Sequence, residues 1–196
     1  MAETASDILN FWVGALDENG LCNPQQQSLW FKASADTDQH CKEAFGIYVE
    51  KAISGELNDW VKSDEGLVAL VILLDQFTRN IYRGTPAAFS GDARALELAQ
   101  HAIASGQYQR LPAIHRLFLC LPLEHTENPS VQECSVERVR ELAETSGHEM
   151  FSGFIRYAVA HRNVIAQFGR FPHRNSILGR ESTREELDYL AVHGGF

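Results

Sequence analysis

Residues 63–84, SDEGLVALVILLDQFTRNIYRG, decide the fold of this protein. Leu67 to Leu74 is an unbroken apolar run, and polar residues follow it on what the spacing predicts to be the same helix, which Gly84 ends. A helix that is apolar on all sides is buried within a fold. Charged side chains on such a helix are costly unless each is paired. The stretch therefore predicts a polar site sunk into a helical core.

Two of the charged residues in this stretch are spaced to meet each other. Asp75 and Arg79 are four residues apart, so they lie on one face of the predicted helix, and Arg83 follows one turn later. We expect Asp75 and Arg79 to form an ion pair. Its contribution to stability depends on burial, because exposed pairs contribute little.

The rest of the chain has the same helical character. Capping residues open most segments and glycines end them, as Gly55 ends the helix predicted from about Asp36 to Ser54. Pro122 is expected to kink or end its helix before a polar loop at 121–129. No stretch alternates with period two. We predict an all-α fold and a single domain over 1–196, with antiparallel helical hairpins packed around a central buried helix at about 64–83.

Composition excludes several classes of function. A net charge of −9 argues against nucleic acid as a partner, because neutralising phosphates requires a basic face. No apolar run approaches the roughly 18 residues of a membrane span, and residues 1–10 lack the pattern of a secretory signal. The four cysteines include no C-x-x-C pair, which is typical of reduced thiols. These features predict a cytoplasmic protein that has no membrane or nucleic-acid partner.

Arginines gather in the later part of the chain. All four lysines precede residue 63, and all the arginines follow it. Residues 150–180 contain no acidic residue but include five arginines: Arg156, Arg162, Arg170, Arg174 and Arg180. Arginine suits bidentate recognition of carboxylates and phosphates and partly buried pairs. We expect this segment to complement Asp75, to bind an anion, or to pair with acids elsewhere in the fold.

Three polar segments stand out: DQFTRNIYRG (75–84), LPLEHTE (121–127) and FGRFPHRNSILGR (168–180). They resemble the bacterial domain-of-unknown-function 924 family, whose pattern runs LLDQFxRNxYRGTxxAF, then LPLxHSE, then FGRFPHRNxxLGRxST. The order and spacing match over most of the chain. Two departures are visible, Thr78 in place of proline and Thr126 in place of serine. The resemblance implies an all-helical fold like that of the tetratricopeptide-repeat superfamily, and no established activity.

We expect residues of the three segments to line one site for a small anionic molecule or peptide. Three residues are candidates for catalysis, namely Asp75, His125 and His173. Those that would bind the ligand are Arg79, Arg83, Glu124, His161, Arg170, Arg174 and Asn175. A histidine oriented by a carboxylate can act as acid or base near neutral pH. No phosphate-binding, dinucleotide or hydrolase motif is present, so we expect no cofactor.

Three alternatives to this interpretation remain. One is a peptide-binding adaptor, as helical-repeat folds often are. Another is a buried ion-pair network in which Asp75 pairs with Arg79, and Glu124 or Glu127 pairs with Arg170 or Arg174. The third is a metal site built from Glu124 and histidines. No two of the candidate histidines lie three or four residues apart, and His161 on an apolar face is typical of a core histidine. We therefore predict no metal.

Overall fold

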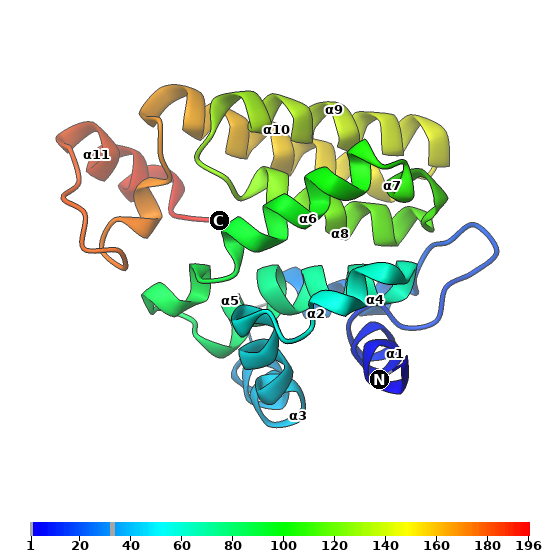
Figure 1. The fold of residues 1–196 in the computed structure, drawn as a ribbon. Coiled ribbons are helices and arrows are strands. Elements are labelled where there is room, and N and C mark those ends of the chain that lie inside the picture. Colours follow the sequence, from blue (N-terminus) through cyan, green and yellow to red (C-terminus); the bar gives the residue numbers. More distant parts are fainter. Residues whose placement is uncertain (1, 32–33) are drawn as a thin grey trace. The chain divides into compact units, whose positions relative to one another are not determined.

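The computed structural model describes residues 2–31 and 34–196, and over these residues the protein is all-helical apart from one isolated bridge between Leu16 and Cys22 (Figure 1). The prediction of an all-α fold is confirmed. The chain packs into two compact units: Met1–Arg83 with Ala87–Pro122, called unit 1, and Gly84–Pro86 with Leu123–Phe196, called unit 2. The single domain stays a prediction. No helix among the described residues is long and apolar enough to cross a membrane.

Unit 1 holds, wholly or for the most part, the elements from α1 to α8. They are α1 (Ala2–Trp12), η1 (Pro24–Gln26), α2 (Gln27–Phe31), α3 (Ala35–Ser54), η2 (Asn58–Lys62), α4 (Asp64–Val71), η3 (Ile72–Phe77), α5 (Thr78–Ile81), η4 (Pro86–Phe89), α6 (Asp92–Ala104), α7 (Gln107–Arg110) and α8 (Ala113–Glu124). Aromatic rings of α1 and α3 pack on Phe77, with Trp12 meeting it edge-on at 5.2 Å between ring centroids.

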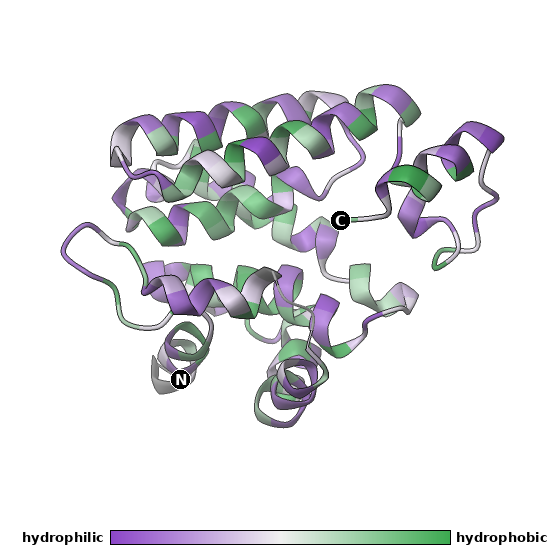
Figure 2. Cartoon of the chain, turned by 180° about the vertical axis from the view of Figure 1, so that it is seen from behind, coloured by the Kyte–Doolittle hydropathy of each residue, from purple (hydrophilic) through white to green (hydrophobic). Residues whose placement is uncertain are grey.

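Unit 2 is built on a long antiparallel hairpin. Its elements are α9 (Pro129–Ser146), α10 (Met150–Phe168), η5 (Pro172–Arg174) and α11 (Arg184–His193). Gly147, with a φ of 64°, ends α9, and α10 then runs back beside it (Figure 1). Hydrophilic and hydrophobic residues alternate around these helices, as the amphipathic period requires (Figure 2).

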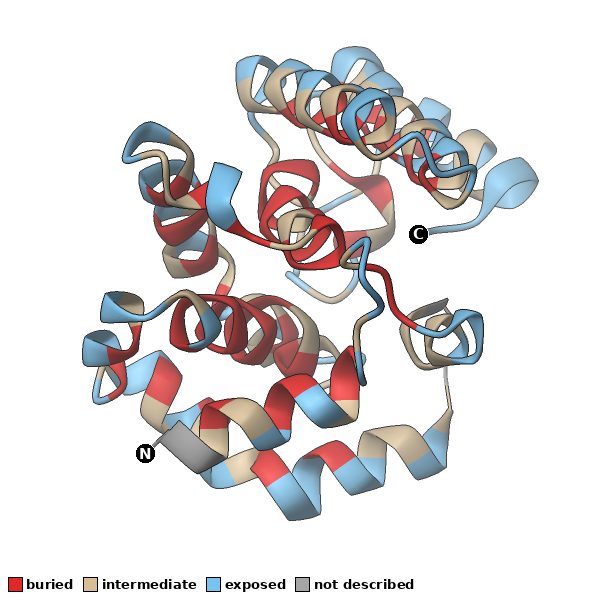
Figure 3. Cartoon of the chain, turned by 90° about the vertical axis from the view of Figure 1, so that its right-hand side faces the viewer, coloured by how far each residue is buried: buried red, intermediate tan, exposed pale blue. Residues whose placement is uncertain are grey.

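The central stretch of the sequence is buried as predicted. Every residue from Gly66 to Asp75 is buried, and so are Phe77 and Thr78 (Figure 3). The stretch is not one uniform α-helix, however, because Ile72–Phe77 is π-helical. A π-helical turn inserts an extra residue into the helical repeat and is common at functional positions. Here it contains Asp75.

A glycine keeps α6 close to this π-helical turn. A Cβ atom added to Gly91 would lie 2.1 Å from the carbonyl oxygen of Leu74, so only glycine fits at that position. The same carbonyl oxygen accepts a 2.8 Å hydrogen bond from the hydroxyl of Thr78, the first residue of α5. The threonine thus satisfies a carbonyl beside a disturbed helical register.

Pro122 does not end α8. The helix continues to Glu124 with the proline inside it, so Glu124 belongs to the last turn of a helix and not to a loop. This differs from the loop expected at 121–129, and it has a consequence for the site. A helical Glu124 has a defined direction and is buried, with only 4% of its surface exposed.

The close approach of Gly91 predicts a matched pair of stability effects. Gly91→Ala should lower the free energy of unfolding by about 1–3 kcal/mol, because the new methyl group meets fixed backbone. Gly46→Ala is the control: its Cβ would contact nothing, and in the interior of α3 it should stabilise by about 0.5–1 kcal/mol. Urea unfolding of both variants measures the difference. Equal effects would contradict the proposed packing.

Candidate functional site

In unit 1, the predicted pair of Asp75 and Arg79 is confirmed. The guanidinium of Arg79 lies 3.3 Å from Asp75 Oδ1 and donates two further hydrogen bonds, of 2.8 and 3.1 Å, to the carboxylate of Asp92. Asp75 is 1% exposed. Burial alone would lower the pKa of Arg79, but the two carboxylates outweigh it and raise that pKa above its ordinary value. Arg79 is therefore a permanent cation shared by two acids.

Arg83 pairs with an acid far away in the sequence. Its guanidinium donates hydrogen bonds of 2.7 and 2.8 Å to Asp38, at the start of α3, and Asn80 adds a third of 2.8 Å. The hydrogen bond from Arg83 is the main reason that the pKa of Asp38 lies below its ordinary value, against an opposing effect of burial. Asp38 ties α5 to α3.

In unit 2, a buried carboxylate organises the loop after α10. Glu186, 2% exposed, accepts hydrogen bonds of 2.6 and 2.9 Å from Arg170, of 3.2 Å from Asn175 and of 2.7 Å from the Thr183 backbone N–H. The hydrogen bond from Arg170 is the largest cause that lowers the pKa of Glu186 to about 2, and burial opposes it. Two predicted ligand-binding residues, Arg170 and Asn175, thus serve this carboxylate.

Glu127 holds the same loop from the other side. It accepts hydrogen bonds of 2.8 and 2.9 Å from Arg180, and another of 2.8 Å from the backbone N–H of Phe171. Burial would raise the pKa of Glu127, but these bonds lower it below the ordinary value. The sequence predicted Arg170 or Arg174 as the partner of Glu124 or Glu127; the bidentate partner of Glu127 is Arg180, and the charge of Arg174 also lowers its pKa. Arg170 pairs with Glu186 instead.

The remaining predicted residues of unit 2 form one group, called here the histidine cluster. Its members are Glu124, His125, His161, His173 and Arg174. The Nδ1 atom of His161 lies 3.1 Å from Glu124 Oε1 and 2.9 Å from the carbonyl oxygen of Tyr157. The ring of His125 lies 6.1 Å from that of His161, between centroids. Three histidines without helical spacing are therefore brought together by the fold.

Phe171 connects the later members of the histidine cluster. Its ring is fully buried and lies 5.6 Å from the rings of both His161 and His173, between centroids. The guanidinium of Arg174 is 4.5 Å from the centre of the same ring, a distance at which a cation is attracted to an aromatic face. Arg174 itself is only 7% exposed. An aromatic ring thus keeps a buried positive charge beside the histidines.

His161 is held neutral. Burial is the largest cause that lowers its pKa to about 3, and the neighbouring His125, His173 and Arg174 add to the effect because each disfavours a further positive charge. The hydrogen bond with the Tyr157 backbone acts in the opposite sense, and burial outweighs it. With Nδ1 facing two oxygen acceptors, the neutral ring carries its proton there, which leaves Nε2 as an acceptor.

The predicted site residues divide between the two units. Asp75, Arg79 and Arg83 belong to unit 1, while the others belong to unit 2. The expectation that the arginines of 150–180 complement Asp75 stays a prediction. Sequence reasoning missed Asp38, Asp92 and Arg180 as partners, and it missed Phe171. Glu186 also forms a capping box with Thr183 at the start of α11, but nothing in that motif indicates that Arg170 binds the same carboxylate.

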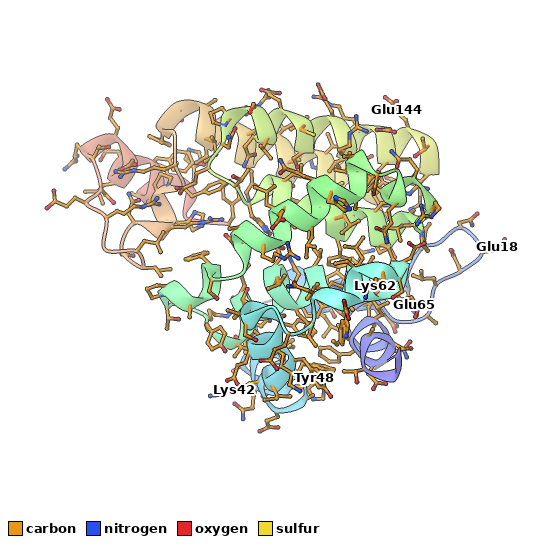
Figure 4. All side chains as sticks on the ribbon, viewed as in Figure 1. Glu18, Lys42, Tyr48, Lys62, Glu65 and Glu144 are labelled. Atoms are coloured by element: carbon orange, nitrogen blue, oxygen red, sulfur yellow. The ribbon has the colours of Figure 1, made fainter. Side chains whose placement is uncertain are left out.

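Other charged residues lie at the surface. Lys42 and Lys62 in unit 1 and Glu144 in unit 2 are exposed and point outward (Figure 4). Within residues 2–31 and 34–196, no group of three or more histidine, cysteine, aspartate or glutamate side chains is arranged to hold a metal ion. The histidine cluster is thus a group of hydrogen-bonding and charged side chains beside an aromatic ring, suited to proton transfer and to binding a polar molecule.

The fold and the site define a class of protein: it is all-helical over the described residues, and it has acid–arginine pairs and a histidine cluster. The family model described as "Bacterial protein of unknown function (DUF924)" matches residues 8–194. The chain therefore belongs to this family. It is also similar to a solved structure, a protein of unknown function from Agrobacterium tumefaciens, with 35% identity, a TM-score of 0.82 and coverage of 96% of this chain and 97% of that one. Comparison with curated proteins gives no match.

The pairing of Arg79 predicts a large loss of stability on its removal. Arg79→Ala should lower the free energy of unfolding by about 3–5 kcal/mol, because the buried Asp75 loses a cation at 3.3 Å. Arg94→Ala is the matched control in unit 1, since the partner of Arg94, Glu97, is exposed, and it should change stability by less than about 1 kcal/mol. Chemical unfolding of both variants tests this, and a similar small loss in each would refute the pairing.

The low pKa of Glu186 predicts a specific loss of stability in acid. A carboxyl group whose pKa is lowered by folding stabilises the fold above its ordinary pKa and loses that contribution as the pH falls toward the folded-state value. Wild type should therefore exceed Glu186→Gln in stability at pH 6, and the difference should shrink as the pH falls below about 4.5 toward 2. Glu144→Gln, at an exposed position, should match wild type throughout. A difference independent of pH, measured by urea unfolding, would contradict this assignment.

Proposed function

We propose that this protein binds a small anionic ligand at the histidine cluster. The supporting observation is that four basic side chains, from three separate segments, gather around the rings of His161 and Phe171. His125 follows α8, His161 lies on α10, and His173 and Arg174 come from η5. Packing alone does not call for three histidines beside a buried arginine, because each opposes the charging of the others.

The electrostatics of the histidine cluster favour an anion. His125, His173 and Arg174 each lower the pKa of His161, because each opposes a further positive charge on that ring. A carboxylate or phosphate placed among these groups would relieve the repulsion and would accept hydrogen bonds from imidazole and guanidinium N–H donors. Arg79, Arg83 and Arg170 bind the carboxylates of Asp92, Asp38 and Glu186, outside the histidine cluster.

A reaction at this cluster would use the Nε2 atom of His161. Glu124 and the Tyr157 carbonyl oxygen orient the ring through Nδ1, and such an orientation prepares the opposite nitrogen to accept a proton. His125 and His173 are the neighbouring proton carriers. The sequence also predicts Asp75 as a catalytic group, and its role stays a prediction because it belongs to unit 1.

The peptide-binding alternative is less well supported. A tetratricopeptide-repeat-like protein would present a row of exposed apolar side chains along a groove between helical hairpins. The large apolar side chains that are exposed lie one or two to an element, as Ile47 and Ile53 on α3, Tyr157 on α10, and Leu187 and Val192 on α11. Single exposed apolar residues are normal on protein surfaces. We therefore favour the small ligand.

The proposal is tested with inorganic phosphate and acetate as probes. A ligand at ten times its dissociation constant stabilises a protein by about 1.4 kcal/mol, which is about 3–5 °C in Tm for a chain of this size. We expect at least one probe to produce this shift and to move the NMR signals of the His161 ring. Arg174→Ala should abolish both effects.

Arg162→Ala provides the control for this experiment. Arg162 also lies on α10 in unit 2, but it pairs with the exposed Glu133 at 3.0 Å. This variant should respond to the anions as wild type does. His173→Asn, at a half-buried position, gives a second test if Arg174→Ala is poorly folded by circular dichroism. The proposal fails if neither probe moves the His161 signals in folded wild-type protein.

A further inference from the structure

The ring of Phe196 covers the buried ring of His161, a member of the histidine cluster. Phe196 stacks on His161 with ring centroids 3.7 Å apart and an angle of 22° between the planes. It also meets Phe171 at 6.0 Å and His173 at 5.9 Å, both edge-on. Aromatic pairs prefer edge-on arrangements such as those with Phe171 and His173. Phe196 therefore lies in a slot with one ring beneath it and two rings at its edges.

Two features of Phe196, its partial exposure and the glycines before it, favour a reversible contact. Half of the Phe196 surface is already exposed to water, so only the other half of its apolar surface becomes exposed when the ring leaves. The ring is carried by two glycines after the end of α11, of which Gly194 has a φ of 68°. Gly195 passes so close to His173 that an added Cβ would lie 2.8 Å from the Cβ of that residue. The tail Gly194–Phe196 thus begins at a glycine that caps α11 and makes a close contact with His173.

The slot combines an aromatic surface with positive charge. His161 and Phe171 supply flat faces, and Arg174 places its guanidinium 4.5 Å from the ring centre of the same Phe171. A ligand that fits both features has a planar ring and an anionic group. Benzoate is a simple example of that chemistry, because its ring can stack on an imidazole while its carboxylate pairs with a guanidinium.

We propose that Phe196 occupies the ring subsite of an aromatic carboxylate ligand, and that the tail Gly194–Phe196 leaves this subsite when the ligand binds. The inference rests on the proposed function, because it assigns a chemical class to the anion. The tail Gly194–Phe196 and the ligand then compete for the same subsite. A tail docked for about nine-tenths of the time lowers the apparent affinity for the ligand about tenfold.

The test compares three proteins and three probes. The proteins are wild type, Phe196→Ala and the control Val192→Ala, whose side chain is 77% exposed at the end of α11. The probes are benzoate, cyclohexanecarboxylate and inorganic phosphate, followed by calorimetry and by the NMR signals of the His161 ring. Benzoate should bind Phe196→Ala about tenfold more tightly than wild type or Val192→Ala. Cyclohexanecarboxylate, which has the charge without the flat ring, should bind more weakly than benzoate in all three.

The outcomes separate this inference from the proposed function. Equal benzoate affinity in wild type and Phe196→Ala overturns the competition by the tail, and equal binding of benzoate and cyclohexanecarboxylate overturns the ring subsite. In either case phosphate or carboxylate binding at the His161 ring still supports an anion site. Absence of any anion effect on His161 in folded wild type and Phe196→Ala overturns both. Phe196→Leu, which keeps the apolar cover and loses the ring, replaces Phe196→Ala if that variant is unfolded.

Discussion

A carboxylate taken out of water needs a cation beside it, and Asp75 imposes this requirement on unit 1. It follows a helical run in which every residue from Gly66 onward is buried. Arg79 supplies the cation from one turn later, and Asp92 holds the other side of the guanidinium. The close contact between Gly91 and the Leu74 carbonyl brings the first residue of α6 within reach. Gly91, which has no side chain, thus allows Asp92 to reach the ion pair of Asp75 and Arg79.

Unit 2 meets the same requirement in two different ways. Glu186 and Glu127 are paired with arginines, whose guanidiniums stay protonated at any physiological pH, so these pairs act as fixed joints of the loop after α10. Glu124 lies beside a histidine, His161, whose ring is held neutral by burial. The carboxylates of Glu186 and Glu127 therefore differ from that of Glu124 in the kind of side chain that they face. The proposed ligand site lies at Glu124 and His161, where the carboxylate faces a neutral imidazole.

Local spacing was a reliable guide only where both partners lie on one helix. The pair of Asp75 and Arg79 is four residues apart and was predictable. Arg83 and Asp38 are 45 residues apart, and no periodicity connects them. The direction of Glu124 was also missed, because a proline inside α8 suggested a break that the helix does not make. Nor does any residue type mark the change to a π-helical register at Ile72, since it concerns hydrogen bonding of the backbone.

The sequence by itself determined the all-α class, the burial of the central helix and the residues that carry polar chemistry. These follow from helical period, caps and residue type, which act within a few turns. Only the tertiary structure decided which charges meet, that His125 and His161 lie together, and that Phe196 covers His161. The physical reason is that such contacts depend on how separate apolar faces pack. That packing sums many weak, non-directional contacts across the chain, and residue spacing along one helix does not encode it.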